Sequence, residues 1–298
     1  MIKRTLFFGN PAYLSTKNEQ LIISFPDKDQ ETKKVAIEDI GVIVLESQQI
    51  TITNGLLEKL TNNNVALINC DQYHLPIGLL MPLNGHTEQT KRFKNQINAS
   101  LPLQKNLWQQ TISAKIMNQA GLLKEKGIPC RKMEIWAKEV TSGDALNHES
   151  RAAIFYWKNL IPIENFTRSQ KGIPPNNLFN YGYAILRAIT ARAIVSSGML
   201  PTLGIFHRNK YNTYCLADDI MEPYRPYVDL IVCHIMETED CYDELNIEIK
   251  KQLLSIATID VYIDGKNSPL MVAMSRTTNS LQECFEGKAR KILYPIYV

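Results

Sequence analysis

Three short segments in the second half of the chain concentrate side chains that could bind a metal ion. The segments are N-H-E-S at 147–150, G-I-F-H-R-N-K-Y-N at 204–212 and L-A-D-D-I-M-E-P-Y-R-P-Y-V-D at 216–229. The candidate ligands among them are the imidazole of His207 and the carboxylates of Glu149, Asp219 and Glu222. Such a set suits Mg²⁺ or Mn²⁺ better than a structural zinc site. Because these ions clamp phosphate oxygens, the segments predict a metal-dependent enzyme acting on phosphodiester bonds.

Each segment taken alone also has an ordinary structural explanation. Glu149 falls in the first turn of a helix that Asn147 could cap, where a carboxylate complements the helix dipole. His207 stands in an expected loop, where a single histidine is more often a surface residue than a ligand. Asp218 could cap the next helix, which would leave the two acids after it as solvated neighbours on one face. Spacing along the chain does not decide between these explanations and a shared site.

Basic side chains accompany these segments and predict contacts with a phosphate backbone. The loop R-S-Q-K at 168–171 adds further positive charge, and Tyr183 is an aromatic residue that could stack on a base. Trp157, by contrast, is expected to pack in the core. The predicted nucleic-acid-binding residues are Arg168, Lys171, Tyr183, Arg187 and Arg208.

The composition is that of an ordinary folded protein rather than a strongly basic one. The 298 residues are 45% hydrophobic and carry a formal net charge of +3, so any nucleic-acid surface must be a local patch. The 6 cysteines include no C-x-x-C pair, which argues against a zinc ribbon and favours free thiols in a reducing compartment. Without a signal-peptide core or a run of about 20 apolar residues, the chain is predicted to be cytoplasmic, with no membrane partner.

The first part of the chain alternates short strand-like runs with turns and predicts an antiparallel, all-β module. Thr53 precedes a plausible short helix, which it could cap. The predicted strands are R-T-L-F-F at 4–8, A-Y-L-S-T at 12–16, Q-L-I-I-S-F at 20–25, K-K-V-A-I at 33–37, G-V-I-V-L-E at 41–46, V-A-L-I-N-C at 65–70 and P-I-G-L-L-M-P-L at 76–83.

Beyond residue 86 the apolar residues recur at helical spacing, as in the stretch 104–123. One exception is Asp264-Gly265, which fits a small hairpin turn. The predicted fold class is therefore α+β, with a β-sandwich-like domain followed by a larger all-α domain. The predicted boundaries are 1–85 for the β-rich dimerisation domain, 86–100 for a linker and first helix, and 101–298 for the helical catalytic domain.

The residues of these motifs and their order along the chain resemble those of the universal CRISPR-associated endonuclease, the spacer-acquisition integrase, in its type II version. The likeness runs over essentially the whole chain in domain order. It rests on N-H-E-S-R-A-A, N-Y-G-Y-A-I-L-R, the two motifs at 204–212 and 216–229, and R-T-T-N-S-L at 276–281. The resemblance implies that Glu149, His207 and Glu222 are the catalytic and metal-binding triad for Mg²⁺ or Mn²⁺, with Asp219 as an additional acid. Many relatives carry a second histidine, or a different residue, where this chain has Phe206, which cannot be a ligand.

The resemblance also implies a reaction and a set of partners. The 3′-hydroxyl of a short captured DNA duplex attacks a phosphodiester at the edge of a repeat, so that the duplex becomes a new spacer. The expected assembly is a homodimer formed through the β domains, with two such dimers bridged by a dimer of a small companion protein. Double-stranded DNA, as prespacer duplex and CRISPR repeat, is the expected substrate, and the effector nuclease is a further expected partner.

Two other functions compete with this one. The first is a non-catalytic DNA-binding scaffold of the same adaptation complex, which the intact Glu–His–Glu set argues against. The second is a metallohydrolase of small phosphoesters, which a strand-rich first domain does little to support. No P-loop or G-x-G-x-x-G pattern indicates a nucleotide cofactor.

Overall fold

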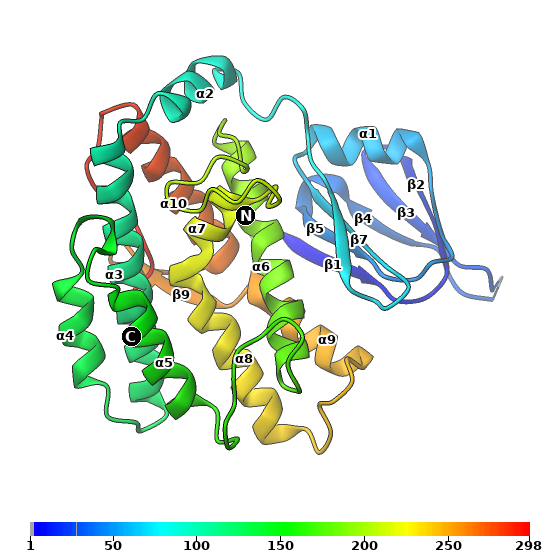
Figure 1. Cartoon of the computed structure of the whole chain (residues 1–298). Coiled ribbons are helices and arrows are strands. Elements are labelled where there is room, and N and C mark those ends of the chain that lie inside the picture. The colour runs from blue at the N-terminus through cyan, green and yellow to red at the C-terminus, as the bar shows by residue number, and fades with distance from the viewer. Residues whose placement is uncertain (1–2, 28) are drawn as a thin grey trace. The chain divides into compact units, whose positions relative to one another are not determined.

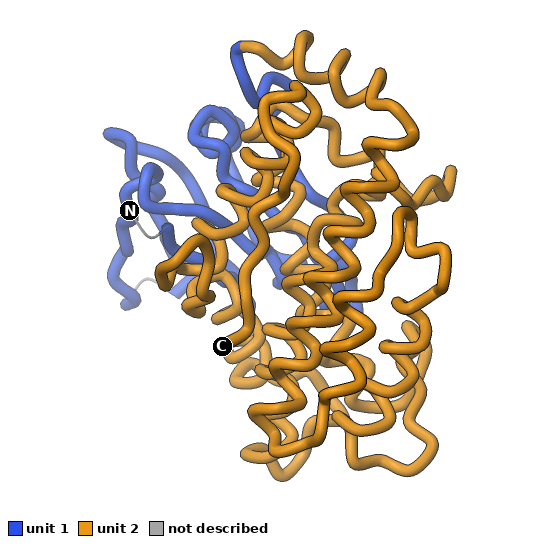
Figure 2. Tube along the Cα trace, turned by 90° about the vertical axis from the view of Figure 1, so that its left-hand side faces the viewer, with its two compact units in different colours: residues 1–87 blue, residues 88–298 orange. Residues whose placement is uncertain are grey.

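The computed structural model describes residues 3–27 and 29–298 of the chain. It divides into two compact units, Met1–Thr87 and Glu88–Val298, coloured separately in Figure 2. The fold is α+β, with the sheets in the first unit and most helices in the second (Figure 1). No helix within the described part of the chain is both long and apolar enough to cross a membrane.

The first unit is built from two four-stranded sheets and one helix. One sheet has the strand order β1-β5-β7-β8 and the other has the order β4-β3-β2-β6. The elements are β1 Arg4–Phe8, β2 Ala12–Lys17, β3 Gln20–Ser24, β4 Lys33–Ala36, η1 Ile37–Asp39, β5 Ile40–Leu45, β6 Ile50–Ile52, α1 Asn54–Asn62, β7 Ala66–Cys70 and β8 Pro76–Leu80. As predicted, the Thr53 side chain caps α1 by accepting a hydrogen bond from the backbone N–H of Leu56 at 3.4 Å.

The prediction of an antiparallel module is wrong for the centre of this unit. Strands β1, β5 and β7 pair in parallel, and β2 pairs in parallel with β6. The physical reason is visible in β5, an unbroken apolar run in which only Leu45 is not fully buried. Strands buried on both faces belong to parallel sheets, and the connection from β5 to β7 contains the helix that such a crossover needs.

A single hydrophobic cluster of this unit takes side chains from both sheets and from α1. Leu14 and Leu21 come from one sheet, Ile43 and Leu67 from the other, and Leu60 from the helix. Three of these five side chains are completely buried. The sandwich-like packing expected from the sequence stays a prediction.

The second unit is helical apart from one hairpin. Its elements are α2 Gln89–Ile97, α3 Leu101–Glu125, α4 Arg131–Glu139, η2 Ser142–Asp144, α5 His148–Leu160, α6 Asn176–Ser196, α7 Cys215–Met221, η3 Glu222–Tyr224, α8 Arg225–Thr238, α9 Ile247–Leu254, η4 Ser255–Ala257, β9 Asp260–Ile263, β10 Lys266–Pro269 and α10 Leu270–Phe285. The predicted turn lies between β9 and β10, with φ of 50° at Asp264 and 78° at Gly265. Both values fit the two positive φ angles of a tight hairpin turn.

Helix α3 is the element around which the second unit is arranged (Figure 1). It spans 25 residues, begins at a Ser100 cap and contacts α4, α5, α8 and η3. Midway along it, the buried Asn118 side chain donates hydrogen bonds to the carbonyl oxygens of Pro223 at 2.7 Å and Pro295 at 3.0 Å. Its own oxygen accepts one from the backbone N–H of Tyr297 at 3.0 Å. One amide thus connects α3 to η3 and to the C-terminal segment.

Replacing Asn118 with alanine is expected to destabilise the helical unit. Three backbone groups would lose their partners, and the free energy of unfolding should fall by about 2–4 kcal/mol. Urea unfolding followed by fluorescence reports on this unit, because all three tryptophans lie within residues 88–298. Asn106→Ala, at an exposed position of the same helix, is the control and should change stability by less than about 0.5 kcal/mol. Equal effects of the two substitutions would contradict the assignment.

Candidate active site

Glu149 enters the site from the first turn of α5, whose cap is not the predicted one. Oδ1 of Asp144 accepts a hydrogen bond from the backbone N–H of His148 at 2.9 Å, and Oδ2 accepts one from that of Glu149 at 3.0 Å. Asn147 has a φ of 54° and its side chain makes no cap hydrogen bond. The prediction that Asn147 caps this helix is therefore wrong. A carboxylate in this place also matches the positive end of the helix dipole.

Glu222 lies where α7 passes into η3, and it is almost completely buried. Asp218 was predicted to cap this helix, but α7 already begins at Cys215, so that prediction is wrong. The Asp218 carboxylate instead accepts hydrogen bonds from Arg187 at 2.6 and 3.1 Å and from Asn212 at 2.7 Å. Through these hydrogen bonds Asp218 connects α7 to Arg187 of α6 and to Asn212 in the loop before α7.

His207 lies in the loop between α6 and α7, and Asp219 controls its orientation. The imidazole Nδ1 is 2.5 Å from Oδ1 of Asp219, which also accepts from the backbone N–H of His207 at 3.3 Å. Oδ2 accepts from the backbone N–H of Phe206 at 2.9 Å. Asp219 is completely buried, and both of its oxygens are taken by this loop. The carboxylate thus fixes the ring through Nδ1 and leaves Nε2 as the second nitrogen of the imidazole, while the part of Asp219 as a metal ligand stays a prediction.

The loop around His207 is further held by close packing. The Phe206 ring stacks on Trp108 of α3 with centroids 4.2 Å apart, and Trp108 also meets the imidazole edge-on at 5.6 Å. Gly204 approaches so closely that a Cβ there would lie 2.5 Å from the His207 carbonyl oxygen. Phe206, which cannot bind a metal ion, thus contributes to the site by packing against Trp108. Trp108 was not predicted for the site, since its spacing marks it only as a core residue.

Lys115 of α3 brings the two glutamates together. Its Nζ is 2.7 Å from Oε1 of Glu149 and 2.6 Å from Oε2 of Glu222, while the other Glu222 oxygen accepts from Arg225 Nε at 2.8 Å. The sequence contained one weak signal for this residue. Lys115 stands next to Ile116 in the predicted apolar stripe of 104–123, where a charged side chain needs a partner.

The electrostatics of the group follow from these contacts. Burial alone would raise the pKa of Glu222, but the positive charges of Arg225 and Lys115 outweigh it and lower the pKa to about 2. The hydrogen bond that the imidazole donates to the Asp219 carboxylate raises the pKa of His207 above its usual value, against the effect of burial. Glu222 and Glu149 raise that pKa further, so both acids lie close enough to act on the imidazole. The predicted triad therefore shares one electrostatic environment.

The donor set fits a hard divalent cation, although a lysine lies between the acids. Within residues 3–27 and 29–298, no cluster of at least three His, Cys, Asp or Glu side chains has the geometry of a metal site. Oε2 of Glu222 is buried and faces the Lys115 ammonium without a well-directed hydrogen bond. Two carboxylates that converge on one positive charge, and an imidazole oriented by Asp219, are donor types that suit Mg²⁺ or Mn²⁺.

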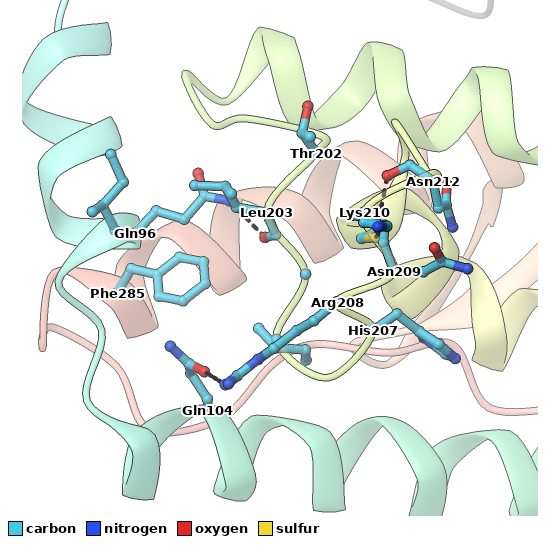
Figure 3. Close-up of a pocket in the computed structure, with 14 residues that line it drawn as sticks. Gln96, Gln104, Thr202, Leu203, His207, Arg208, Asn209, Lys210, Asn212 and Phe285 are labelled. Carbon is cyan, nitrogen blue, oxygen red and sulfur yellow. Dashed lines mark hydrogen bonds between the residues drawn. The ribbon is translucent and has the colours of Figure 1, made fainter.

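Two cavities adjoin these residues. The His207 cavity, of about 430 Å³, has His207, Arg208 and Lys210 in its wall, as Figure 3 shows. The Glu222 cavity, of about 270 Å³, is lined in part by Lys115, Glu222, Arg168 and Arg225. Each combines residues of the candidate site with basic side chains, which suits a polyanionic ligand.

The predicted DNA-contact residues occupy different environments. Arg208 lines the His207 cavity and donates to Gln104 Oε1 at 2.7 Å. Arg168 lines the Glu222 cavity and donates to Asn176 and Asn180. Lys171 is exposed, and Arg187 pairs with Asp218. Contacts of these four residues with DNA stay predictions.

Tyr183 does not have the environment expected of a base-stacking residue. It is only 7% exposed, and its hydroxyl donates to the buried carboxylate of Asp229 at 2.5 Å. Tyr156 donates to the same carboxylate at 2.7 Å. The guanidinium carbon atoms of Arg168 and Arg225 lie 5.2 and 4.5 Å from the Tyr183 ring centroid. Tyr183 also lines the Glu222 cavity, where its ring packs against the two arginines, and its predicted contact with DNA stays a prediction.

Fold and site together define a two-unit α+β protein whose helical unit gathers two glutamates and an oriented histidine. The family described as "CRISPR associated protein Cas1" matches residues 6–255. This chain belongs to the Cas1 family. The CRISPR-associated endonuclease Cas1 of Neisseria meningitidis serogroup C (strain 8013) is 37% identical over 295 residues, which cover 98% of this chain and 95% of that protein. The family resemblance drawn from the motifs is confirmed, and this relative is consistent with a type II-like version.

Solved structures share the fold at lower sequence identity. A casposase bound to integration product matches with a TM-score of 0.77 and 20% identity, covering 98% of this chain and 92% of the casposase. A Cas6-RT-Cas1–Cas2 complex matches with a TM-score of 0.72 and 20% identity, covering 97% of this chain and 36% of the matched chain. At these identities the likeness shows the fold alone.

Substituting Asp219 with asparagine is expected to lower the pKa of His207, because the carboxylate that favours the imidazolium disappears. The pair stabilises the fold fully below the unfolded histidine pKa of about 6.5, and this contribution is lost as the pH rises through the raised folded pKa. The stability difference between wild type and Asp219→Asn in EDTA should therefore be larger at about pH 6 than at about pH 8.5. NMR titration of the imidazole measures the pKa directly. Asp218→Asn is the control, and an unchanged His207 pKa in Asp219→Asn would refute the proposed orientation role.

Proposed function

We propose that this chain is a divalent-metal-dependent DNA endonuclease and integrase that inserts short foreign duplexes into a CRISPR array. The observation that supports it best is that Glu149 and Glu222, from separate segments, meet at one largely buried cation, while Asp219 holds the imidazole of His207 in one orientation. The names of the Neisseria relative, an endonuclease, and of the casposase, seen with its integration product, support the same reaction class.

The reaction exchanges one phosphodiester for another. The 3′-oxygen of the incoming duplex forms a bond to the phosphorus at the repeat edge, and the bond from that phosphorus to the 3′-oxygen of the repeat strand breaks. The proton of the attacking hydroxyl is released to solvent, and the departing 3′-oxygen takes one up. Because the number of ester bonds is unchanged, no nucleotide hydrolysis is required.

The residues of this chain would hold and orient the reactants. Glu149, Glu222 and Nε2 of His207 would bind Mg²⁺ or Mn²⁺, which when bound neutralises charge at the phosphate. With a pKa of about 2, Glu222 remains ionised at neutral pH. Asp219 keeps the imidazole in one orientation. Arg208 and Arg168, in the walls of the two cavities, would bind flanking phosphates by charge-assisted hydrogen bonds.

Substitutions in the triad should abolish strand transfer without unfolding the protein. Glu149→Gln and His207→Ala are each expected to lower the rate by at least about 100-fold, the usual order for loss of electrostatic stabilisation. The assay combines the protein with its small companion, a short duplex with free 3′-hydroxyl ends and a repeat-bearing plasmid, with and without EDTA. DNA affinity should change little, since the phosphate contacts remain. His234→Ala, at an exposed position on α8, is the matched control.

The competing function is a non-catalytic DNA-binding scaffold, and the same assay separates the two. Wild-type protein that binds DNA but joins no 3′-hydroxyl end, with Mn²⁺ and the companion present, would support the scaffold. Near-wild-type strand transfer by either triad variant would refute the assigned site.

The assembly proposed for the reaction is a homodimer through the β-rich unit, with two dimers bridged by a dimer of the companion protein. The Cas6-RT-Cas1–Cas2 complex supports a companion of the Cas2 type. Self-association is supported by an apolar patch near β8, an edge strand of its sheet. Tyr73 is 72% exposed there and Ile77 is 65% exposed. Exposed apolar patches of this kind mark interaction sites.

A charge placed in this patch should weaken self-association. Ile77→Glu is expected to shift the protein toward monomers in sedimentation-velocity experiments, because the new carboxylate would be buried without a partner. Ile154→Glu, at a 69% exposed isoleucine of α5, is the matched control. A dimer that is equally stable in both variants would exclude this patch from the interface.

A further inference from the structure

Lys115 forms ion pairs with both glutamates of the triad. Its side chain is 12% exposed, against 26% for Glu149 and 7% for Glu222. Each partner comes from a different element: Lys115 from α3, Glu149 from the first turn of α5, and Glu222 from η3. The ammonium group therefore joins three elements of the helical unit at one point.

Lys115 contacts one oxygen of each glutamate, Oε1 of Glu149 and Oε2 of Glu222. Arg225 already bonds Oε1 of Glu222, so Oε2 is the oxygen that faces the ammonium. Without a cation between them, Oε2 of Glu222 and Oε1 of Glu149 would face each other as like charges in a largely buried place, which is unfavourable. A metal ion bound between these acids would take the place of the ammonium, and at Glu222 it would need the same oxygen, Oε2, because Arg225 holds Oε1.

We propose that Lys115 is a positioning residue that holds Glu149 and Glu222 in place for the metal and competes with the metal for their oxygens. This inference rests on the proposed function, because it takes the two glutamates as metal ligands. The ammonium keeps the acids together while no metal is bound. Metal binding then displaces it from both carboxylates.

The surroundings of Lys115 allow this displacement. The residue lines the Glu222 cavity of about 270 Å³, so the flexible lysine chain has space into which it can withdraw. Arginine in the same position would be less easily displaced, since its planar guanidinium binds carboxylates in a bidentate manner. A lysine is a single-point cation on a mobile stem, and it suits a contact that must be broken.

The test is the affinity of the full-length protein for Mn²⁺, measured by isothermal titration calorimetry with MnCl₂ alone. Lys115→Met keeps the length of the apolar stem and removes the competing charge. Its Kd for Mn²⁺ should be lower than that of wild type by at least about tenfold, which corresponds to about 1.4 kcal/mol. In EDTA its melting temperature should be lower than that of wild type, because the acids then lack a counter-ion. The rise in melting temperature on adding MnCl₂ should be correspondingly larger.

A matched control and a second variant separate this role from a structural one. Lys126 follows the last residue of α3 and pairs with Glu237. The control variant Lys126→Met removes this lysine and should leave the Kd for Mn²⁺ unchanged. If Lys115→Met fails to fold, Lys115→Gln takes its place in the test. The glutamine is neutral but still donates hydrogen bonds to carboxylates, and this variant should also bind Mn²⁺ more tightly than wild type. A purely structural lysine would lower the melting temperature without tightening metal binding.

The possible failures are distinguishable. If wild type binds Mn²⁺ and Glu222→Gln does not, while folded Lys115 variants bind with unchanged or weaker affinity, the role of Lys115 is refuted and the metal site stands. If wild type itself binds no Mn²⁺ in the absence of DNA and its binding with DNA is insensitive to Glu149→Gln and Glu222→Gln, both the metal site and the role of Lys115 are refuted.

Discussion

The ion bridge from Lys115 to Glu149 and Glu222 is the interaction on which the candidate site depends. Two ionised acids repel each other in a largely buried place, and a positive charge between them removes that repulsion. The need to offset that repulsion explains why α3 runs beside both acid-bearing elements, and why Arg225 is committed to the second oxygen of Glu222. Charge balance thus links the packing of the helical unit to the chemistry that its acids can perform.

A second constraint acts on the loop that carries His207. An irregular loop cannot hold an imidazole in one orientation by its own backbone hydrogen bonds. Here the buried Asp219 carboxylate accepts hydrogen bonds from two successive backbone N–H groups and from the imidazole itself. In addition, Phe206 of the loop stacks on Trp108 of α3. The rigid α7 and α3 therefore place a side chain that belongs to neither helix.

Buried acids and aromatic rings also position the arginines in the cavity walls, as Asp219 and Trp108 position the His207 loop. Asp229 accepts from Tyr156 and Tyr183, and burial raises its pKa to about 6 against the effect of those hydrogen bonds. The Tyr183 ring in turn supports Arg168 and Arg225. The polar end of Tyr183 is thus bonded inside the protein, while its ring lines the Glu222 cavity beside the two arginines.

Local chemistry was readable from the sequence alone: the Thr53 cap, the Asp264-Gly265 turn, the helical stripe of α3 and the residue types of the Glu149, His207 and Glu222 motifs. Each depends on neighbours a few residues away. Only the tertiary structure decided the parallel pairing of β1, β5 and β7, the capping of α5 by Asp144, the use of Asp219 to orient His207 and the place of Lys115 between the acids. Apart from the Asp144 cap, whose partners are four and five residues away, those features depend on contacts between residues farther apart in the chain, and a buried charge reveals its partner only when the fold brings the two together.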